Sequence, residues 1–143
     1  QALLEHHLPY DEALICFLDG EQTPLQSAYA LITGYLHANT DFTAIFTATD
    51  EAAIGAIAAV KDHGLRVPED IAVVSIDNIE LASMVRPALT TVDIPKQTLA
   101  QAAIQALQTH RTFPDQSNRS VLLPTKLIIR ESCGAKQPGH SGK

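Results

Sequence analysis

Residues 42–77, which read FTAIFTATDEAAIGAIAAVKDHGLRVPEDIAVVSID, limit what this chain can fold into more than any other stretch. Residues 43–48 are a short apolar and β-branched run, which predicts a strand. Apolar residues recur at helical spacing over residues 51–63, and Gly64 stands where a left-handed residue ends a helix. Residues 71–76 are a second apolar run, as expected of a strand buried on both faces of a parallel sheet. The stretch therefore predicts a βαβ unit with a right-handed crossover.

Polar residues follow both predicted strands: Thr49 and Asp50 after the first, and Asp77 and Asn78 after the second. The carboxyl ends of parallel strands meet at one edge of a sheet, where ligands collect and helix N-termini offer unpaired N–H donors. The Asp77 carboxylate could accept hydrogen bonds from two vicinal sugar hydroxyls or from a ring N–H. Its alternative role is to cap a following short helix through the N–H groups of Asn78 and Ile79.

The remaining segments carry signals for short helices and strands. Thr23 followed by Pro24 predicts a helix start, because threonine is a good N-cap and proline fits the first helical position. A helix at residues 95–110 has a broad apolar face that needs another surface to cover it. In chain order, the predicted elements outside the βαβ unit are the end of a helix at residues 2–7, a strand at 14–18, a helix from Thr23 to about Ala38, a short helix at 78–85, an extended segment at 89–92, the helix at 95–110 and a strand at 120–130.

Composition and charge restrict the class of protein. The chain has 143 residues, 45% of them hydrophobic, which suffices for one ordinary domain with its own core. Its formal charge is −6 and its 10 lysines and arginines are scattered, so no basic stripe is present to bind DNA phosphates. No apolar run is long enough to cross a membrane and the first residues lack signal-peptide features, so we expect a cytoplasmic protein. Cys16 and Cys133 have neither zinc spacing nor the density of a disulfide framework, which predicts two free thiols.

Three separated strings carry a resemblance to a known family: residues 44–77, PALTTV at residues 87–92, and PTKLIIRES at residues 124–132. In this order they resemble the effector-binding core of the LacI/GalR family of bacterial transcriptional repressors, and the match covers nearly the whole chain. The resemblance implies an α/β fold with a doubly wound parallel sheet, as in one lobe of the periplasmic-binding-protein type. It also implies a C-terminal piece of a longer repressor, because such repressors carry an N-terminal helix-turn-helix and a two-lobed core.

The resemblance further implies a division of the chain between two lobes. Residues 1–91 are expected in the C-terminal lobe, residues 92–118 in a segment of the N-terminal lobe, and residues 119–135 in the return strand and the C-terminal end. Residues 136–143 have no apolar anchor, so we expect them to be disordered. The implied partners are a small sugar or nucleoside-like effector, a second copy of the full-length repressor in a homodimer, and operator DNA, which the absent N-terminal domain would bind.

The family pattern implies effector contacts at four residues: Asp77, Thr49, Asp50 and Gln22. The residue that matches Asp77 touches the effector in the family. Thr49 stands at a position, usually asparagine, that reaches the ligand, and Asp50 is expected to act mainly as the N-cap of the following helix. Gln22 falls nearest to the place where an aromatic residue usually stacks on the effector, so either hydrogen bonds hold the ligand there or another side chain stacks. Asn78 replaces a second aspartate of the pattern.

Other classes of function leave no comparable signal in the sequence. No GxSxG, HExxH, phosphate-loop or GxGxxG motif occurs, so we predict neither an enzyme nor a bound metal or cofactor. The alternative to a repressor is a lobe of the same type in a solute-binding protein for sugar transport, which a secretory signal peptide upstream would indicate. A receiver domain phosphorylated at Asp50 would need neighbouring carboxylates and a lysine in an order that Asp77 and Lys96 do not follow.

Overall fold

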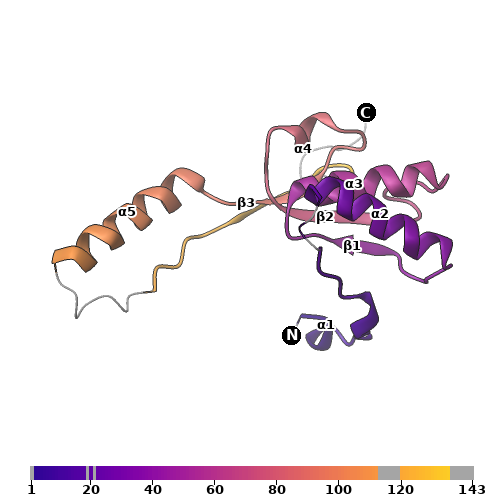
Figure 1. Cartoon of the computed structure of the whole chain (residues 1–143), viewed down its shortest axis with the longest axis horizontal. Coiled ribbons are helices and arrows are strands. Elements are labelled where there is room, and N and C mark those ends of the chain that lie inside the picture. The colour runs from indigo at the N-terminus through magenta and orange to yellow at the C-terminus, as the bar shows by residue number, and fades with distance from the viewer. Residues whose placement is uncertain (1, 19, 21, 113–119, 136–143) are drawn as a thin grey trace.

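The computed structural model describes residues 2–18, 20, 22–112 and 120–135, and it consists of an α/β body and an arm (Figure 1). The body contains the sheet and the helices that cover it, and the arm extends away from the body and carries one long helix. The predicted disorder of residues 136–143 lies outside the described residues. The elements in chain order are α1 (Ala2–Glu5), the 3-10 helix η1 (Glu12–Leu14), α2 (Pro24–His37), β1 (Ala44–Phe46), α3 (Asp50–Asp62), β2 (Ala72–Asp77), α4 (Leu81–Met84), β3 (Thr90–Asp93), α5 (Lys96–Thr112) and β4 (Lys126–Ile128).

Four strands form one sheet in the order β1-β2-β3-β4. β2 is parallel to both β1 and β3, with Ile45 opposite Val73, and β4 runs antiparallel to β3. The predicted βαβ unit is confirmed as β1, α3 and β2, the short helix predicted at residues 78–85 as α4, and the extended segment at residues 89–92 as β3. The predicted α/β class with a parallel sheet is confirmed, because helical segments connect three parallel neighbouring strands.

α3 begins one residue earlier than predicted, and its N-cap is Thr49. The Thr49 hydroxyl accepts a hydrogen bond from the N–H of Ala52 at 3.3 Å, and the Thr49 backbone is extended, with φ −138° and ψ 151°. The prediction that Asp50 caps this helix is therefore wrong. Asp50 is the first helical residue, and its side chain turns into the body, where it is fully buried. At the other end of α3, Gly64 has the predicted left-handed conformation, with φ 79°.

α2 packs closely against α3. Its predicted start is confirmed, because Thr23 accepts a hydrogen bond from the N–H of Gln26 at 3.3 Å and Pro24 is the first helical residue. Gly55 marks a very close approach of the two helices, since a Cβ atom at this position would lie 2.1 Å from the carbonyl oxygen of Leu25. Glycine is needed here because any side chain would collide with the α2 backbone.

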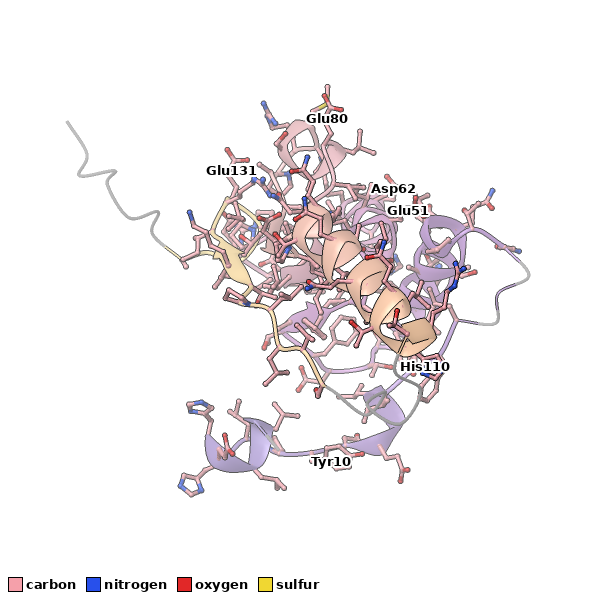
Figure 2. The ribbon with its side chains drawn as sticks, turned by 90° about the vertical axis from the view of Figure 1, so that its left-hand side faces the viewer. Tyr10, Glu51, Asp62, Glu80, His110 and Glu131 are labelled. Atoms are coloured by element: carbon pink, nitrogen blue, oxygen red, sulfur yellow. The ribbon has the colours of Figure 1, made fainter. Side chains whose placement is uncertain are left out.

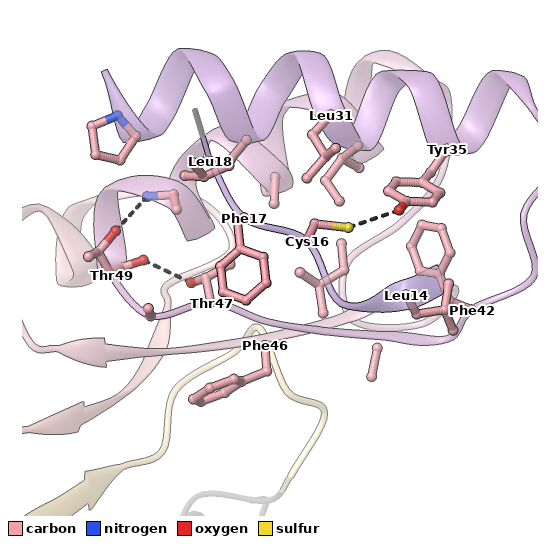
Figure 3. A pocket seen from close by; sticks show the side chains of 18 residues that line it. Leu14, Cys16, Phe17, Leu18, Leu31, Tyr35, Phe42, Phe46, Thr47 and Thr49 are labelled. Carbon is pink, nitrogen blue, oxygen red and sulfur yellow. Dashed lines mark hydrogen bonds between the residues drawn. The ribbon is translucent and has the colours of Figure 1, made fainter. Parts of the chain in front are cut away.

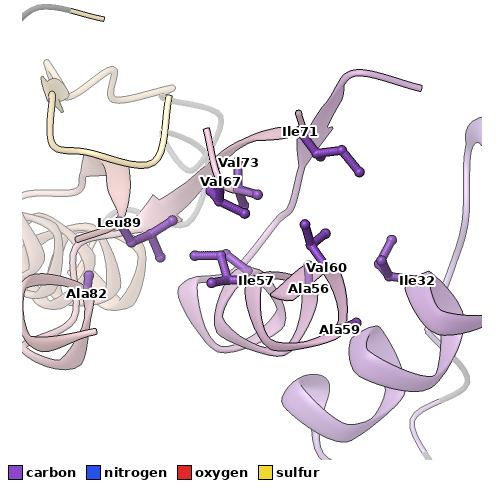
Figure 4. Packing of buried hydrophobic residues seen from close by; sticks show 11 residues of the cluster. Ile32, Ala56, Ile57, Ala59, Val60, Val67, Ile71, Val73, Ala82 and Leu89 are labelled. Carbon is purple, nitrogen blue, oxygen red and sulfur yellow. The ribbon is translucent and has the colours of Figure 1, made fainter. Parts of the chain in front are cut away.

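The core lies between α3 and one face of the sheet, with α2 on the same side of the sheet as α3 (Figure 4). α3 contributes mainly small and branched residues, so its backbone lies near the strands. This single cluster joins α2, α3, β2, α4 and the segment before β3, and it stabilises the body that carries the polar strand ends. The buried cluster consists of Ile32, Ala53, Ala56, Ile57, Ala59, Val60, Val67, Ile71, Val73, Ala82 and Leu89.

The strand predicted at residues 14–18 is wrong. Glu12–Leu14 form η1, and residues 15–18 join no ladder within the described part of the chain. They pass along β1 without pairing, and Phe17 is 90% exposed. β1 is therefore the edge strand of the described sheet. An apolar run becomes a strand when its backbone finds a partner edge, and residue spacing alone does not decide this.

The helix predicted at residues 95–110 is confirmed as α5, which forms most of the arm. The chain leaves the body through β3 and returns through β4, and β4 is the paired part of the strand predicted at residues 120–130. Among the described residues no side chain of α5 is buried, and Leu107 is 70% exposed. Figure 2 shows α5 in front of the body, with α1, the helix end predicted at residues 2–7, and Tyr10 set apart below. None of the helices in the described ranges combines the length and the apolar character that a membrane span requires.

Candidate functional site

The parallel strands β1, β2 and β3 end at the same edge of the sheet, and we call the polar residues at these ends the rim. The last residues of β2 and β3, Asp77 and Asp93, lie opposite each other in the ladder. α3 also starts at this edge, so its first turn faces the rim. The structure thus brings together Thr49, Asp50 and Asp77, as the strand order predicts. The rim consists of Thr47, Thr49, Asp77, Asn78 and Asp93.

Asp50 lies beneath the rim and anchors it. Its fully buried carboxylate accepts hydrogen bonds from the hydroxyls of Ser75 and Thr91, the latter at 2.6 Å, and from the backbone N–H of Ile79 at 2.8 Å. Its place in the first turn of α3 adds the favourable field of a helix N-terminus. The donors come from β2, β3 and the turn after β2, so one carboxylate ties three segments to α3.

Asp77 lies in a turn that is held from several sides. Asp77 and Asn78 both have positive φ angles, 126° and 52°. The N–H of Asn78 donates to the Thr91 hydroxyl at 3.2 Å, and the ammonium group of Lys96 donates to the carbonyl oxygen of Asp77. Within the described chain, no group hydrogen-bonds to or pairs with the half-buried Asp77 carboxylate. This carboxylate is therefore available to a donor from outside the chain.

The alternative role of Asp77 as a helix cap is wrong. The N–H of Ile79 donates to Asp50, and the N–H of Asn78 donates to Thr91. α4 begins after Glu80, which makes no side-chain capping bond in the described structure. The donors that Asp77 was expected to cap therefore have other acceptors.

Gln22 does not line the cavity beside the rim. It is exposed and lines an adjoining hollow beside α2, which Phe17 also lines but Thr49 and Asp77 do not. Phe17, which the sequence placed inside a predicted strand, lies beside Thr47 instead (Figure 3). Phe17 was not among the candidate residues predicted from the sequence, although it is the aromatic residue nearest in sequence to Gln22. Its high exposure could not be read from the sequence.

A cavity of about 440 Å³ opens beside the rim, between β1, α2, α3 and residues 14–18 (Figure 3). Its lining is mainly apolar, with Thr47 and Thr49 at the rim end, where the Thr47 hydroxyl donates to the Thr49 carbonyl oxygen at 2.8 Å. Farther along, the Cys16 thiol and the Tyr35 hydroxyl lie 2.8 Å apart, and this hydrogen bond raises the pKa of Tyr35. Both cysteines are free thiols. Apolar walls with a few polar groups at the mouth are typical of small-molecule sites.

The fold and the rim together define a class of protein. A mostly parallel sheet with hydroxyls at its strand ends, and with a carboxylate there that has no partner among the described residues, is typical of an α/β ligand-binding lobe. No three His, Cys, Asp or Glu side chains of the described residues converge on a possible metal position. The family model of the periplasmic binding protein-like domain matches residues 1–133, and the chain belongs to this family, in the form found in LacI/GalR-type regulators.

Known relatives and solved structures agree with this assignment. The HTH-type transcriptional regulator MalR of Clostridium butyricum is 37% identical over 133 residues, which cover 93% of this chain and 38% of MalR. The transcriptional regulator CelR in complex with cellobiose is 30% identical with a TM-score of 0.80, over 92% of this chain and 39% of that chain. The lac repressor dimer bound to operator and the anti-inducer ONPF is 31% identical with a TM-score of 0.70, over 77% of this chain and 38% of that chain. The chain thus spans less than two fifths of the length of each relative.

Proposed function

We propose that this chain is the effector-sensing part of a LacI/GalR-type transcription regulator and that its rim binds a small sugar or nucleoside-like molecule. The observation that carries the proposal is the Asp77 carboxylate, which has no partner among the described residues although a well-held turn presents it. Charge-assisted hydrogen bonds are about twice as strong as neutral ones, so a free carboxylate is a strong acceptor for ligand hydroxyls. MalR and CelR are named as regulators and CelR was solved with cellobiose, which supports a regulator that senses a saccharide.

Each residue near the rim has a role in this proposal. Asp77 accepts hydrogen bonds from two ligand hydroxyls. The Thr49 hydroxyl accepts from a backbone N–H of α3, which leaves its own proton free for a ligand oxygen. Phe17 offers an aromatic face to the apolar side of a sugar ring, and we assign it this stacking position because it lines the cavity beside the rim together with Thr47 and Thr49, whereas Gln22 does not. Asp50 holds the rim from inside, without contact to the ligand.

The same proposal divides the chain between two lobes. β3 and β4 run side by side between the body and the arm, and we propose that they are hinge strands. Residues 1–91 then form most of the C-terminal lobe, residues 92–118 belong to the N-terminal lobe, and residues 119–135 contain the return strand and the C-terminal end. This division follows the arrangement of the body and the arm around β3 and β4.

In this proposal the effector acts by shifting an equilibrium between open and closed lobes. The shift changes the spacing of two DNA-binding heads in a homodimer, and the effector must bind the two states unequally to have this effect. Operator DNA is bound by a helix-turn-helix outside this sequence, because the chain itself has a net charge of −6. The relative solved as a dimer on its operator, the lac repressor, supports this arrangement.

The proposal is tested on the full-length regulator that contains this chain. A thermal-shift screen with maltose, cellobiose, ribose and nucleosides identifies the ligand class, because a molecule that binds only the folded state raises the unfolding temperature. Isothermal titration calorimetry with the most stabilising compound then compares Asp77→Asn with Glu80→Gln. Both substitutions exchange a carboxylate for an amide, but Glu80 is exposed and lies outside the rim.

We expect Asp77→Asn to weaken binding about 10- to 100-fold, because a hydrogen bond to a charged group contributes about 1.5–3 kcal/mol. Glu80→Gln should leave the affinity unchanged. Unchanged affinity in Asp77→Asn would reject Asp77 as a ligand contact. A screen in which no sugar or nucleoside raises the unfolding temperature would reject the ligand class.

A further inference from the structure

The side chain of Asn78 lies between two opposite charges. Nη2 of Arg130 donates to Oδ1 of Asn78 at 2.7 Å, and Nδ2 of Asn78 donates to Oδ1 of Asp93 at 3.0 Å. Nη1 of Arg130 also donates to the carbonyl oxygen of Leu89 at 2.7 Å, which holds the guanidinium group in place. The side chains in this row are half-buried and come from three segments: the turn after β2, the end of β3 and the residues after β4.

An amide is the side chain that suits this position. It carries an acceptor and donors in one small plane, so it can accept from a guanidinium group and donate to a carboxylate at the same time. An aspartate at position 78 could accept from Arg130, but its second oxygen would face Asp93 without a hydrogen between them. Two carboxylates that close cannot both remain ionised at little cost. The neighbouring charges therefore favour asparagine and also decide which way its amide group lies.

The backbone of this turn depends on its surroundings. Asp77 and Asn78 have φ angles of 126° and 52°, and residues other than glycine hold such conformations when the structure around them fixes the chain. Thr91 and Asp50 accept the N–H groups of Asn78 and Ile79, which holds the main chain from the inside. The Asn78 amide holds it from the side of β3 and β4. The Asp77 carboxylate has no hydrogen-bond partner among the described residues, so the backbone of the turn is the part of its surroundings that hydrogen bonds hold in place.

We infer that Asn78 is a positioning residue: its amide, held between Arg130 and Asp93, fixes the turn that directs the Asp77 carboxylate and links this turn to β3 and β4. The part that concerns the ligand rests on the proposed function, and the part that concerns the turn does not. The inference has a clear chemical signature. The double variant Asn78→Asp/Asp93→Asn still has one guanidinium group, one carboxylate and one amide side by side. Only the positions of the carboxylate and the amide are exchanged.

The test compares Asn78→Asp, Asp93→Asn and the double variant, with Asn39→Asp as the matched control. Asn39 is also left-handed, with φ 54°, but it is exposed and follows the end of α2. The full chain is followed by thermal unfolding between pH 4 and pH 7. Hydrogen exchange at the N–H of Ile79 reports on the turn, and exchange at the N–H of Val60, in the buried part of α3, reports on global opening.

At pH 7 we expect Asn78→Asp to lower Tm by about 3–6 °C and to speed exchange at Ile79 more than at Val60. Its carboxylate would face that of Asp93, with Arg130 on its other side and Lys126 opposite Asp93 in the β3–β4 ladder. The repulsion between the two carboxylates is full at pH 7 and decreases as they are protonated at lower pH. The double variant should regain most of the Tm and of the protection at Ile79, and Asn39→Asp should change neither.

The inference would be overturned if the decreases in Tm of the two single variants add up in the double variant. It would also be overturned if the decrease in Tm of Asn78→Asp does not change with pH. Cellobiose, tested on the full-length regulator, gives the proposed function a separate readout. If the double variant rescues the turn but cellobiose raises no Tm, the inference stands and the cellobiose-like ligand class fails. If Asp77→Asn abolishes a cellobiose effect, but the double variant regains nothing that Asn78→Asp loses, the proposed function stands and the inference fails.

Discussion

Asp50 and Asp77 lie at the same edge of the sheet, but their surroundings give them different roles. The Asp50 carboxylate is fully buried and accepts from two hydroxyls and a backbone N–H, so its charge serves to hold the segments together. Removing it would leave buried donors without an acceptor, which is costly. The Asp77 carboxylate is half-buried and has no partner in the described part of the chain. Burial and partners, and not the type of residue, separate the structural acid from the binding candidate.

Arg66 and Asp70 predict a pH dependence of stability. Hydrogen bonds from the side chain and the backbone N–H of Arg66 lower the pKa of Asp70 to about 2, from its usual value of 3.8. The folded state therefore binds this proton less tightly than the unfolded chain does. The pair stabilises the fold above about pH 4, and this contribution is lost as the pH falls toward 2. Asp70→Asn should remove this part of the acid sensitivity in urea unfolding measured from pH 2 to pH 6.

The control for this pair is Asp41→Asn, which makes the same exchange of a carboxylate for an amide at an exposed position. The effect at Asp70 should be small and should decrease further in high salt, because 69% of the Arg66 side chain and 32% of the Asp70 side chain are exposed. The prediction would be contradicted if the free energy of unfolding decreases by the same amount in the wild type and in Asp70→Asn as the pH falls from 6 to 2.

At the scale of elements, two helical glycines give opposite predictions. Gly55→Ala would place a Cβ atom 2.1 Å from the carbonyl oxygen of Leu25, so α2 and α3 must move apart. We expect it to lower the free energy of unfolding by about 1–3 kcal/mol, the usual cost of overpacking. In Gly34→Ala, in α2, the new Cβ atom has no described atom within 4 Å. This substitution should raise the free energy of unfolding by up to about 1 kcal/mol, because alanine has the higher helix propensity.

Urea unfolding of the two variants measures both effects under the same conditions. Gly34→Ala serves as the control for the Gly55 variant, because both introduce the same methyl group into a helix. Equal stability of the two variants would show that the close contact of α2 and α3 does not exist in solution.

At the scale of the whole molecule, the arm presents an uncovered apolar surface. Leu99, Ile104 and Leu107 on α5 are 50%, 57% and 70% exposed among the described residues. Neighbouring apolar side chains with this exposure are uncommon on the free surface of a protein and mark a place where another surface packs. This supports the proposal that residues 92–118 belong to the second lobe.

The arrangement of body and arm predicts that the 143-residue chain offers only part of a ligand cleft. Small ligands are usually about 70–90% buried, and in the proposed site the rim would contact a ligand from one side only. Calorimetry with the ligand found in the thermal-shift screen should show saturable binding by the full-length regulator and none by the 143-residue chain, with thermal unfolding to confirm that both are folded. Tight one-to-one binding by the shorter chain would contradict this prediction.

The sequence by itself determined the elements whose signals are local. Thr23 and Pro24 are adjacent, so the start of α2 could be predicted, and Gly64 marked the end of α3. The rim could be located as well, because parallel strands end at one edge and the residues after them are known from the sequence. The resemblance to the LacI/GalR family rested on such continuous strings.

The tertiary structure alone decided which backbone segments pair and where the polar side chains point. Residues 15–18 are apolar enough for a strand, but they join no ladder among the described residues. Asp50 turns inward because its donors stand 25 to 41 residues away along the chain, and Asn78 meets charges that β3 and β4 bring to it. The energies of these contacts exist only once distant segments have come together, so a local pattern cannot encode them.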